Sequence, residues 1–200
     1  MAEDASFLLK GDENMGDWQD DLISFLFITP DMMMDRITRG WREEQENKPI
    51  TLNSRLSAAL NKCPSPWING ICRQLGLNPK ALRTKRKKVA AIQAHLTDVS
   101  KLRQVVKSLP AASLQALNYV LEHGGWVKIG QLTRRFGKMD DVGWFWDEEE
   151  PPVSPLGQLR VRGLLFVGKA GLKGRSYRVA VIPKELREPL GILLAESSPR

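Results

Sequence analysis

The sequence has few residues that could bind a metal or act as a nucleophile. It contains two cysteines, Cys63 and Cys72, and two histidines, His95 and His123, which lie far from the cysteines along the chain. A four-ligand zinc set would therefore need carboxylates as well. Neither histidine has a serine or cysteine partner that the sequence identifies. We expect no metal, no cofactor and no enzymatic activity, and we expect both cysteines to be reduced structural thiols.

Long apolar runs are absent too. No stretch of about 18 apolar residues occurs, so no membrane-spanning helix is expected. The first ten residues carry Glu3 and Asp4, where a secretory signal would carry cations. With 42% hydrophobic residues the chain can form the core of one large or two small domains. We expect a globular cytoplasmic protein, associated with the nucleoid if it binds DNA.

Charge is distributed unevenly, which is more informative than the net value of +7. Residues 1–50 have 5 Lys+Arg against 12 Asp+Glu, a sum of −7. Residues 73–107 have 10 basic residues against the single acid Asp98, a sum of +9, and residues 156–200 have 9 against 3, a sum of +6. Cations that only kept a protein soluble would be spread evenly. Two basic blocks behind an acidic segment instead suggest a polyanion as partner.

Periodicity and capping residues divide the chain into three parts. Residues 1–50 form an acidic segment, with a short helix that Pro30 should stop, a second helix over residues 31–41, and a linker or solvated helix end over residues 42–48. Residues 52–107 form a basic helical module, in which Thr84 caps a helix running to about Leu96 and Asp98 caps the next one.

Residues 108–195 show a specific order of elements. We expect helices over residues 111–123 and 129–136 with a short strand over 126–128 between them, a long loop over 138–153, and a third helix opened by Ser154 and Pro155. Strands over 164–167 and 176–182 then flank a glycine-rich loop, and a helix from Pro183 ends the part. The sequence therefore predicts a mainly helical α+β fold with a small β-hairpin, in which a winged-helix domain follows a helical module.

Two short stretches resemble known families. Ser154-Pro155-Leu156-Gly157-Gln158-Leu159, Gly163-Leu164-Leu165 and residues 181–187 resemble winged-helix regions that accompany bacterial repair-type helicases. Leu75-Gly76-Leu77 followed by residues 84–96 resembles the helix-turn-helix pair of the SAP module and of the Rho N-terminal region. Those families usually have a glycine before the lysines, where this chain has Ala81, Leu82 and Arg83. The resemblance implies nucleic-acid binding through the basic start of the second helix.

The first candidate binding site is this helix start. Lys85, Arg86, Lys87 and Lys88 occupy the first turn, where the helix dipole already places positive partial charge. Free N–H groups together with cations form an anion site, and Lys80 and Arg83 add to it. The alternative is an ordinary solvated run or a localisation-like signal.

The second candidate site lies in the expected winged-helix domain. Helical stepping turns Leu156 and Leu159 inward and Gln158, Val161 and Arg162 outward, with Arg160 at the flank. An exposed third helix is the position from which such folds read the major groove. The glycine-rich loop over residues 168–175 lacks the ending of a nucleotide-binding loop. We interpret it as a flexible wing whose cations contact a nucleic acid: Lys169, Lys173 and Arg175, with Arg178 on the following strand.

Two functions remain open. The first is nucleic-acid binding by a non-catalytic protein, with double-stranded DNA expected rather than RNA, in transcriptional regulation or as a repair or chromosome accessory factor. The second is a protein-interaction adaptor that docks a partner through Trp144, Phe145 and Trp146, although these side chains could equally cover the core. Residues 1–50 could also fold back on the basic blocks as an autoinhibitor. Base specificity and oligomeric state are not predicted.

Overall fold

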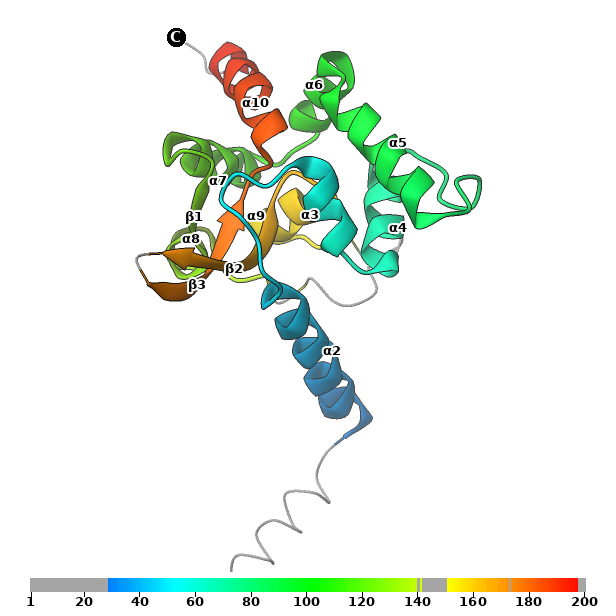
Figure 1. Cartoon of the computed structure of the whole chain (residues 1–200), viewed down its shortest axis with the longest axis vertical. Helices are drawn as coiled ribbons and strands as arrows, with labels where there is room; N and C mark the ends of the chain where they lie inside the picture. Colours follow the sequence, from blue (N-terminus) through cyan, green and yellow to red (C-terminus); the bar gives the residue numbers. More distant parts are fainter. Residues whose placement is uncertain (1–28, 140, 142–150, 173, 198–200) are drawn as a thin grey trace, which may run out of the picture. The chain divides into compact units, whose positions relative to one another are not determined.

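The computed structural model describes residues 29–139, 141, 151–172 and 174–197. The chain divides into two compact units, Met1–Thr38 and Arg39–Arg200. Helix α2 (Pro30–Glu46) crosses this boundary. All the other described elements belong to the second unit (Figure 1).

Four helices form the first half of the second unit. They are α3 (Leu56–Lys62), α4 (Ser65–Gln74), α5 (Lys85–Thr97) and α6 (Val99–Lys107). The predicted caps are confirmed: the side chain of Thr84 accepts from the N–H of Lys87, and that of Asp98 accepts from the N–H groups of Ser100 and Lys101. Local sequence signals thus fix where α5 and α6 begin.

The second half contains the sheet. Its elements are α7 (Ala111–Glu122), β1 (Trp126–Lys128), α8 (Ile129–Phe136), α9 (Pro155–Val161), β2 (Phe166–Leu172), β3 (Arg175–Val181) and α10 (Lys184–Ser197). The antiparallel strands are ordered β1-β3-β2, with Val127 opposite Ala180 and Gly168 opposite Val179. A mainly helical fold with a small C-terminal hairpin is therefore confirmed, in the element order that the sequence predicted.

One hydrophobic core runs through both halves. Helix α9 contacts both α4 and α7, and α10 contacts α3, α5, α6 and α7. Fully buried leucines come from early and late in the chain alike, among them Leu60, Leu96, Leu159 and Leu190. The segments predicted as a helical module and a winged-helix domain thus pack against each other within one unit.

Helix α2 contains the helix predicted over residues 31–41 and begins at Pro30, because a proline at the first helical position loses no hydrogen bond. The stretch 42–48, expected to be a linker or a solvated helix end, continues α2 to Glu46, and its Gln45 and Glu46 are buried instead of solvated. The helix predicted before Pro30 lies mostly outside the described residues.

Candidate nucleic-acid interface

The start of α5 presents a group of exposed cations. Residues 80–88 contain six Lys or Arg and no acid. Four of these side chains are exposed and, in the part of the chain that the structure describes, have no hydrogen-bond or ion-pair partner; they are Lys80, Arg83, Arg86 and Lys87. We call these four residues the α5 surface.

The other two cations of this stretch hold the helix in place. The ammonium group of Lys85 donates to the carbonyl oxygens of Asn61 and Cys63, at 2.8 and 2.7 Å, and so caps the end of α3. Lys88 donates to the side-chain oxygen of Asn69 on α4, at 2.7 Å. Lys85 and Lys88 are therefore engaged inside the protein and not free to bind a partner. Their place in the sequence did not distinguish them from their neighbours.

The loop before α5 has an unusual backbone. Gly76 ends α4 in the left-handed region, with φ at +72°, and the N–H of Leu77 bonds back to the carbonyl of Cys72. Arg83 has φ at +33°, the one positive φ at a non-glycine residue among those described. A side chain strains the backbone there, and such strain is found most often at functional sites.

The electrostatics of the α5 surface also oppose stability. The first turn of α5 contains no acid, although the positive end of a helix dipole favours one. Its first N–H groups have no acceptor within the helix, and only that of Lys87 is capped by Thr84. An anion bound here would be stabilised by both the cations and the free N–H groups.

Helix α9 does not form an exposed recognition helix. Leu156, Gly157, Leu159, Arg160 and Val161 are all buried, because α4 covers one side of α9 and α7 another. The expectation that Val161 faces outward is therefore wrong.

The remaining polar side chains of α9 are engaged locally. Gln158 is half-buried and donates to the carbonyl of Pro152. Arg162 donates to the backbone and side-chain oxygens of Gln158, and burial lowers its pKa. In this structure α9 offers no side chain that could read a base edge.

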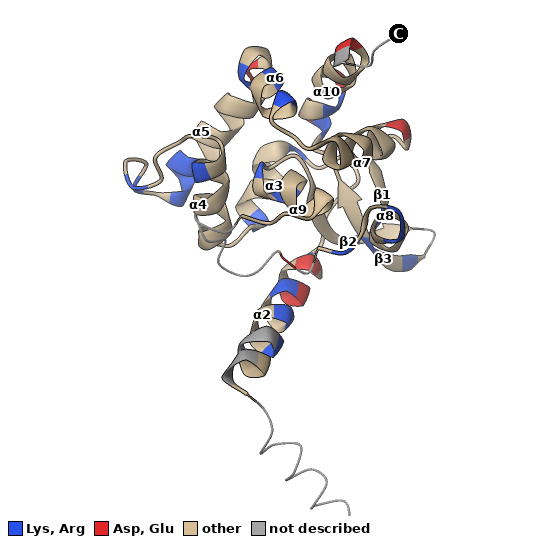
Figure 2. Cartoon of the chain, turned by 180° about the vertical axis from the view of Figure 1, so that it is seen from behind, with Lys and Arg blue, Asp and Glu red and all other residues tan. Residues whose placement is uncertain are grey.

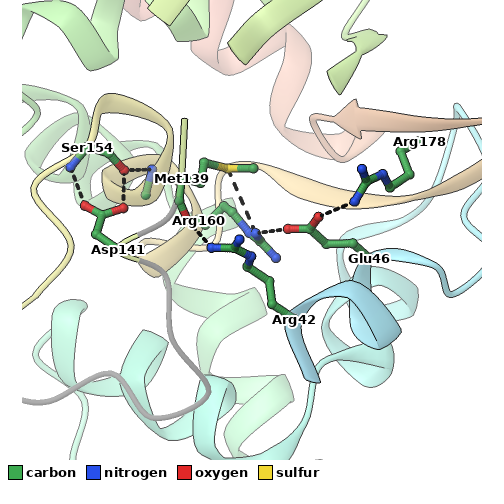
Figure 3. A network of polar contacts seen from close by, with 8 residues as sticks. Arg42, Glu46, Met139, Asp141, Ser154, Arg160 and Arg178 are labelled. Atoms are coloured by element: carbon green, nitrogen blue, oxygen red, sulfur yellow. Dashed lines mark hydrogen bonds and ion pairs between the residues drawn. The ribbon is translucent and has the colours of Figure 1, made fainter. Parts of the chain in front are cut away.

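Arg160 is part of an internal network, which corrects its prediction as a nucleic-acid contact. Only 5% of the residue is exposed. Its guanidinium lies 2.7 Å from the Glu46 carboxylate and stacks over Trp67, with 4.8 Å between Cζ and the ring centroid. Figure 3 shows Glu46 between Arg160 and Arg178, and the second carboxylate oxygen lies 3.4 Å from Arg178. The ion pair between Glu46 and Arg160 was not predicted from the sequence, because 114 residues separate the two side chains along the chain.

The predicted flexible wing is a regular hairpin. β2 continues to Leu172 and β3 begins at Arg175, so most of the expected loop is strand. The outer edge of β2 is covered, since Lys169 exchanges backbone hydrogen bonds with Lys48 and Ile50, at 2.9 and 2.8 Å. The sequence did not predict strand beyond residue 167, because glycine and polar residues alternate there. The backbone of Lys48 and Ile50, which pairs with β2 at this point, comes from a distant part of the chain. Lys173 lies outside the described residues.

The hairpin and α8 together expose a second set of cations. Lys169 lies directly opposite Arg178 in the register, so their side chains share one face of the sheet. Arg178 and Lys138 line an open cleft of about 200 Å³, which Gly130 of α8 also lines. Arg134 is exposed and donates to the carbonyl of Gly130. We call Arg134, Lys138, Lys169 and Arg178 the hairpin surface; the sequence analysis did not identify its two members near α8 as site residues. Arg175 is exposed near the hairpin tip.

The α5 surface and the hairpin surface do not form one face. Figures 1 and 2, which view the chain from opposite sides, both place α5 at one end of the second unit and α8 with the hairpin at the other. The basic helix start and the cations of the expected wing, which the sequence predicted as two candidate sites, therefore lie apart in the structure.

No group of three or more His, Cys, Asp or Glu among the described residues could hold a metal ion. Burial raises the pKa of the Cys63 thiol to about 11, which keeps it protonated and unreactive. No described helix has the length and apolar character to cross a membrane. The aromatic residues Trp144, Phe145 and Trp146 lie outside the described residues.

Comparisons with known proteins found no match for this chain among protein families, curated proteins or solved structures. The resemblances to winged-helix, SAP and Rho N-terminal regions therefore stay predictions.

Proposed function

We propose that the protein is a non-catalytic cytoplasmic protein that binds double-stranded DNA through the α5 surface. The observation that carries the proposal is the exposure of Lys80, Arg83, Arg86 and Lys87 together, with no carboxylate partner among the described residues. Cations that no internal acid neutralises bind phosphates and release the counterions condensed on the nucleic acid. Their position at the start of α5, where the backbone of Arg83 is strained and the first turn contains no acid, favours an anion as ligand.

The contacts of this surface are with phosphates. Half or more of the hydrogen bonds between proteins and DNA go to phosphate and sugar, many of them from arginine, lysine and helix starts. The helix that would enter a major groove in a winged helix, α9, has five buried residues: Leu156, Gly157, Leu159, Arg160 and Val161. Such a protein binds many sequences with similar affinity. This favours a chromosome or repair accessory factor over a regulator that reads one operator.

The test is fluorescence anisotropy with a duplex of about 20 base pairs and its single strand, across salt from about 50 to 200 mM. Four phosphate contacts give a slope of log K against log salt of about −3 to −4 for the duplex. Arg86→Glu/Lys87→Glu should lower the affinity at least tenfold and flatten the slope by about two. Arg83→Gly should weaken binding and flatten the slope by about one. It should also raise the stability, because glycine accepts φ at +33°.

The matched control changes the same amount of charge elsewhere. Lys107 on α6 and Lys184 on α10 are exposed and lie outside the α5 surface. Lys107→Glu/Lys184→Glu should change duplex affinity much less than Arg86→Glu/Lys87→Glu. Equal losses would show a nonspecific effect of net charge and would refute the assignment to α5. A salt slope near zero for the wild type would refute nucleic-acid binding itself and point to the adaptor.

A further inference from the structure

We propose that one molecule of this protein bridges two DNA duplexes, one on the α5 surface and one on the hairpin surface. The proposal rests on the proposed function, since it assigns a second duplex to the same kind of phosphate contact. It follows from three features of the second unit.

The first feature is the uncompensated charge of the hairpin surface. Glu46 is the one carboxylate that lines the cleft among the described residues, and it is buried. One of its oxygens contacts Arg160 and the other contacts Arg178. Lys138 and Lys169 are exposed without a side-chain partner among the described residues. A single buried acid shared by two arginines leaves the described lining of this cleft with more cations than acids.

The second feature is shape. The cleft between the end of α2, α8 and β3 has a volume of about 200 Å³, enough for a phosphate group and its water. The side chain of Arg178 is 42% exposed, so it can turn from Glu46 toward an anion at the cleft without being pulled from the core. Lys169 lies beside it on the same face of the sheet.

The third feature is the separation of the two surfaces. They lie at opposite ends of the second unit in both views (Figures 1 and 2). A compact unit of this size has a radius of gyration of roughly 15 Å, whereas duplex DNA has a persistence length of about 500 Å. Bending a duplex of about 20 base pairs around so small an object costs elastic energy, which favours a separate, straight duplex on each surface. Each surface therefore takes its own duplex.

The test is a capture assay with the full chain. One duplex of about 20 base pairs is immobilised on beads, a second carries a fluorophore, and the fluorescence retained on the beads is measured at about 50 mM salt. The wild type should retain the second duplex. Lys138→Glu/Lys169→Glu should reduce capture about tenfold and leave the affinity for a single duplex within about threefold. Arg86→Glu/Lys87→Glu should also abolish capture, and Lys107→Glu/Lys184→Glu should retain it.

Each outcome has a distinct meaning. Binding of one duplex without capture by the wild type overturns bridging and leaves the proposed function intact. No binding to either duplex overturns both. Full capture by Lys138→Glu/Lys169→Glu shows that two copies present their α5 surfaces together, and this also overturns the role of the hairpin surface.

Discussion

Replacing Glu46 tests how the buried guanidinium of Arg160 is stabilised. Both side chains are almost fully buried, with 6% and 5% exposed, and they are 2.7 Å apart. Glu46→Leu leaves a buried cation without its counter-charge, which costs about 3 to 5 kcal/mol of unfolding free energy. The ring of Trp67 remains against the guanidinium, but a cation–π contact contributes only about 0.5 to 2 kcal/mol. For a chain of this length we expect the midpoint of thermal unfolding to fall by roughly 6 to 20 °C.

The assay is urea unfolding followed by circular dichroism, with the single variants and Glu46→Leu/Arg160→Met compared. Two apolar side chains of similar volume remove both charges together, so the double variant should be more stable than either single variant and within about 2 kcal/mol of the wild type. The exposed pair Arg103–Glu196, with side chains 45% and 46% exposed, is the control. Glu196→Gln should cost about 1 kcal/mol or less.

The reasoning is refuted if Glu46→Leu costs no more than Glu196→Gln, or if the double variant loses as much as both single variants added together. The double variant also separates structure from binding. Because Arg160 is buried, Glu46→Leu/Arg160→Met should bind duplex DNA through the α5 surface as tightly as the wild type. A large loss of affinity for duplex DNA in this double variant would show that Arg160 contributes to DNA binding after all.

Three further results are expected. Gly168→Ala should lower the unfolding free energy by about 1 to 3 kcal/mol in urea titrations, because the new Cβ would lie 2.7 Å from the carbonyl oxygen of Lys48. Ser113→Ala should raise it by about 1 kcal/mol, since the buried Ser113 hydroxyl has no hydrogen-bond partner among the described residues. The N–H of Lys101 lowers the pKa of Asp98 below its usual 3.8. The stability from this carboxylate is thus complete above pH 3.8 and is lost as the pH falls through the lower folded-state pKa, so wild type and Asp98→Asn should respond differently to acid.

Features that depend on neighbours in the sequence were predicted well. Thr84, Asp98 and Ser154 cap their helices as expected, because each cap is a contact across two or three residues. The strand at residues 126–128 and the presence of a hairpin were also predicted, although β2 extends to Leu172 into the expected loop. The clustering of cations at the start of α5 was also evident from the sequence, because these residues are neighbours along the chain.

Features that depend on distant segments were not predictable in the same way. The burial of α9 requires α4, which the sequence analysis assigned to a different module. The burial of Arg160 requires Glu46, in a stretch that was expected to be a linker or a solvated helix end. The helical periodicity of α9 correctly predicted that Leu156 and Leu159 are buried. It could not predict that the opposite side of α9 is covered as well, because that depends on contacts with other helices.

The covering of α9 changes what kind of recognition the protein can perform. A winged helix with its third helix exposed contacts base edges and gains specificity from them. Here Val161 and Arg160 pack inside, and Gln158 and Arg162 bond to each other. The exposed cations of the two proposed sites lie instead at the two ends of the unit, on the α5 surface and the hairpin surface. If the protein binds DNA as proposed, its affinity depends on the number of phosphates in reach, and it should vary little when the base sequence of the duplex is changed at constant length.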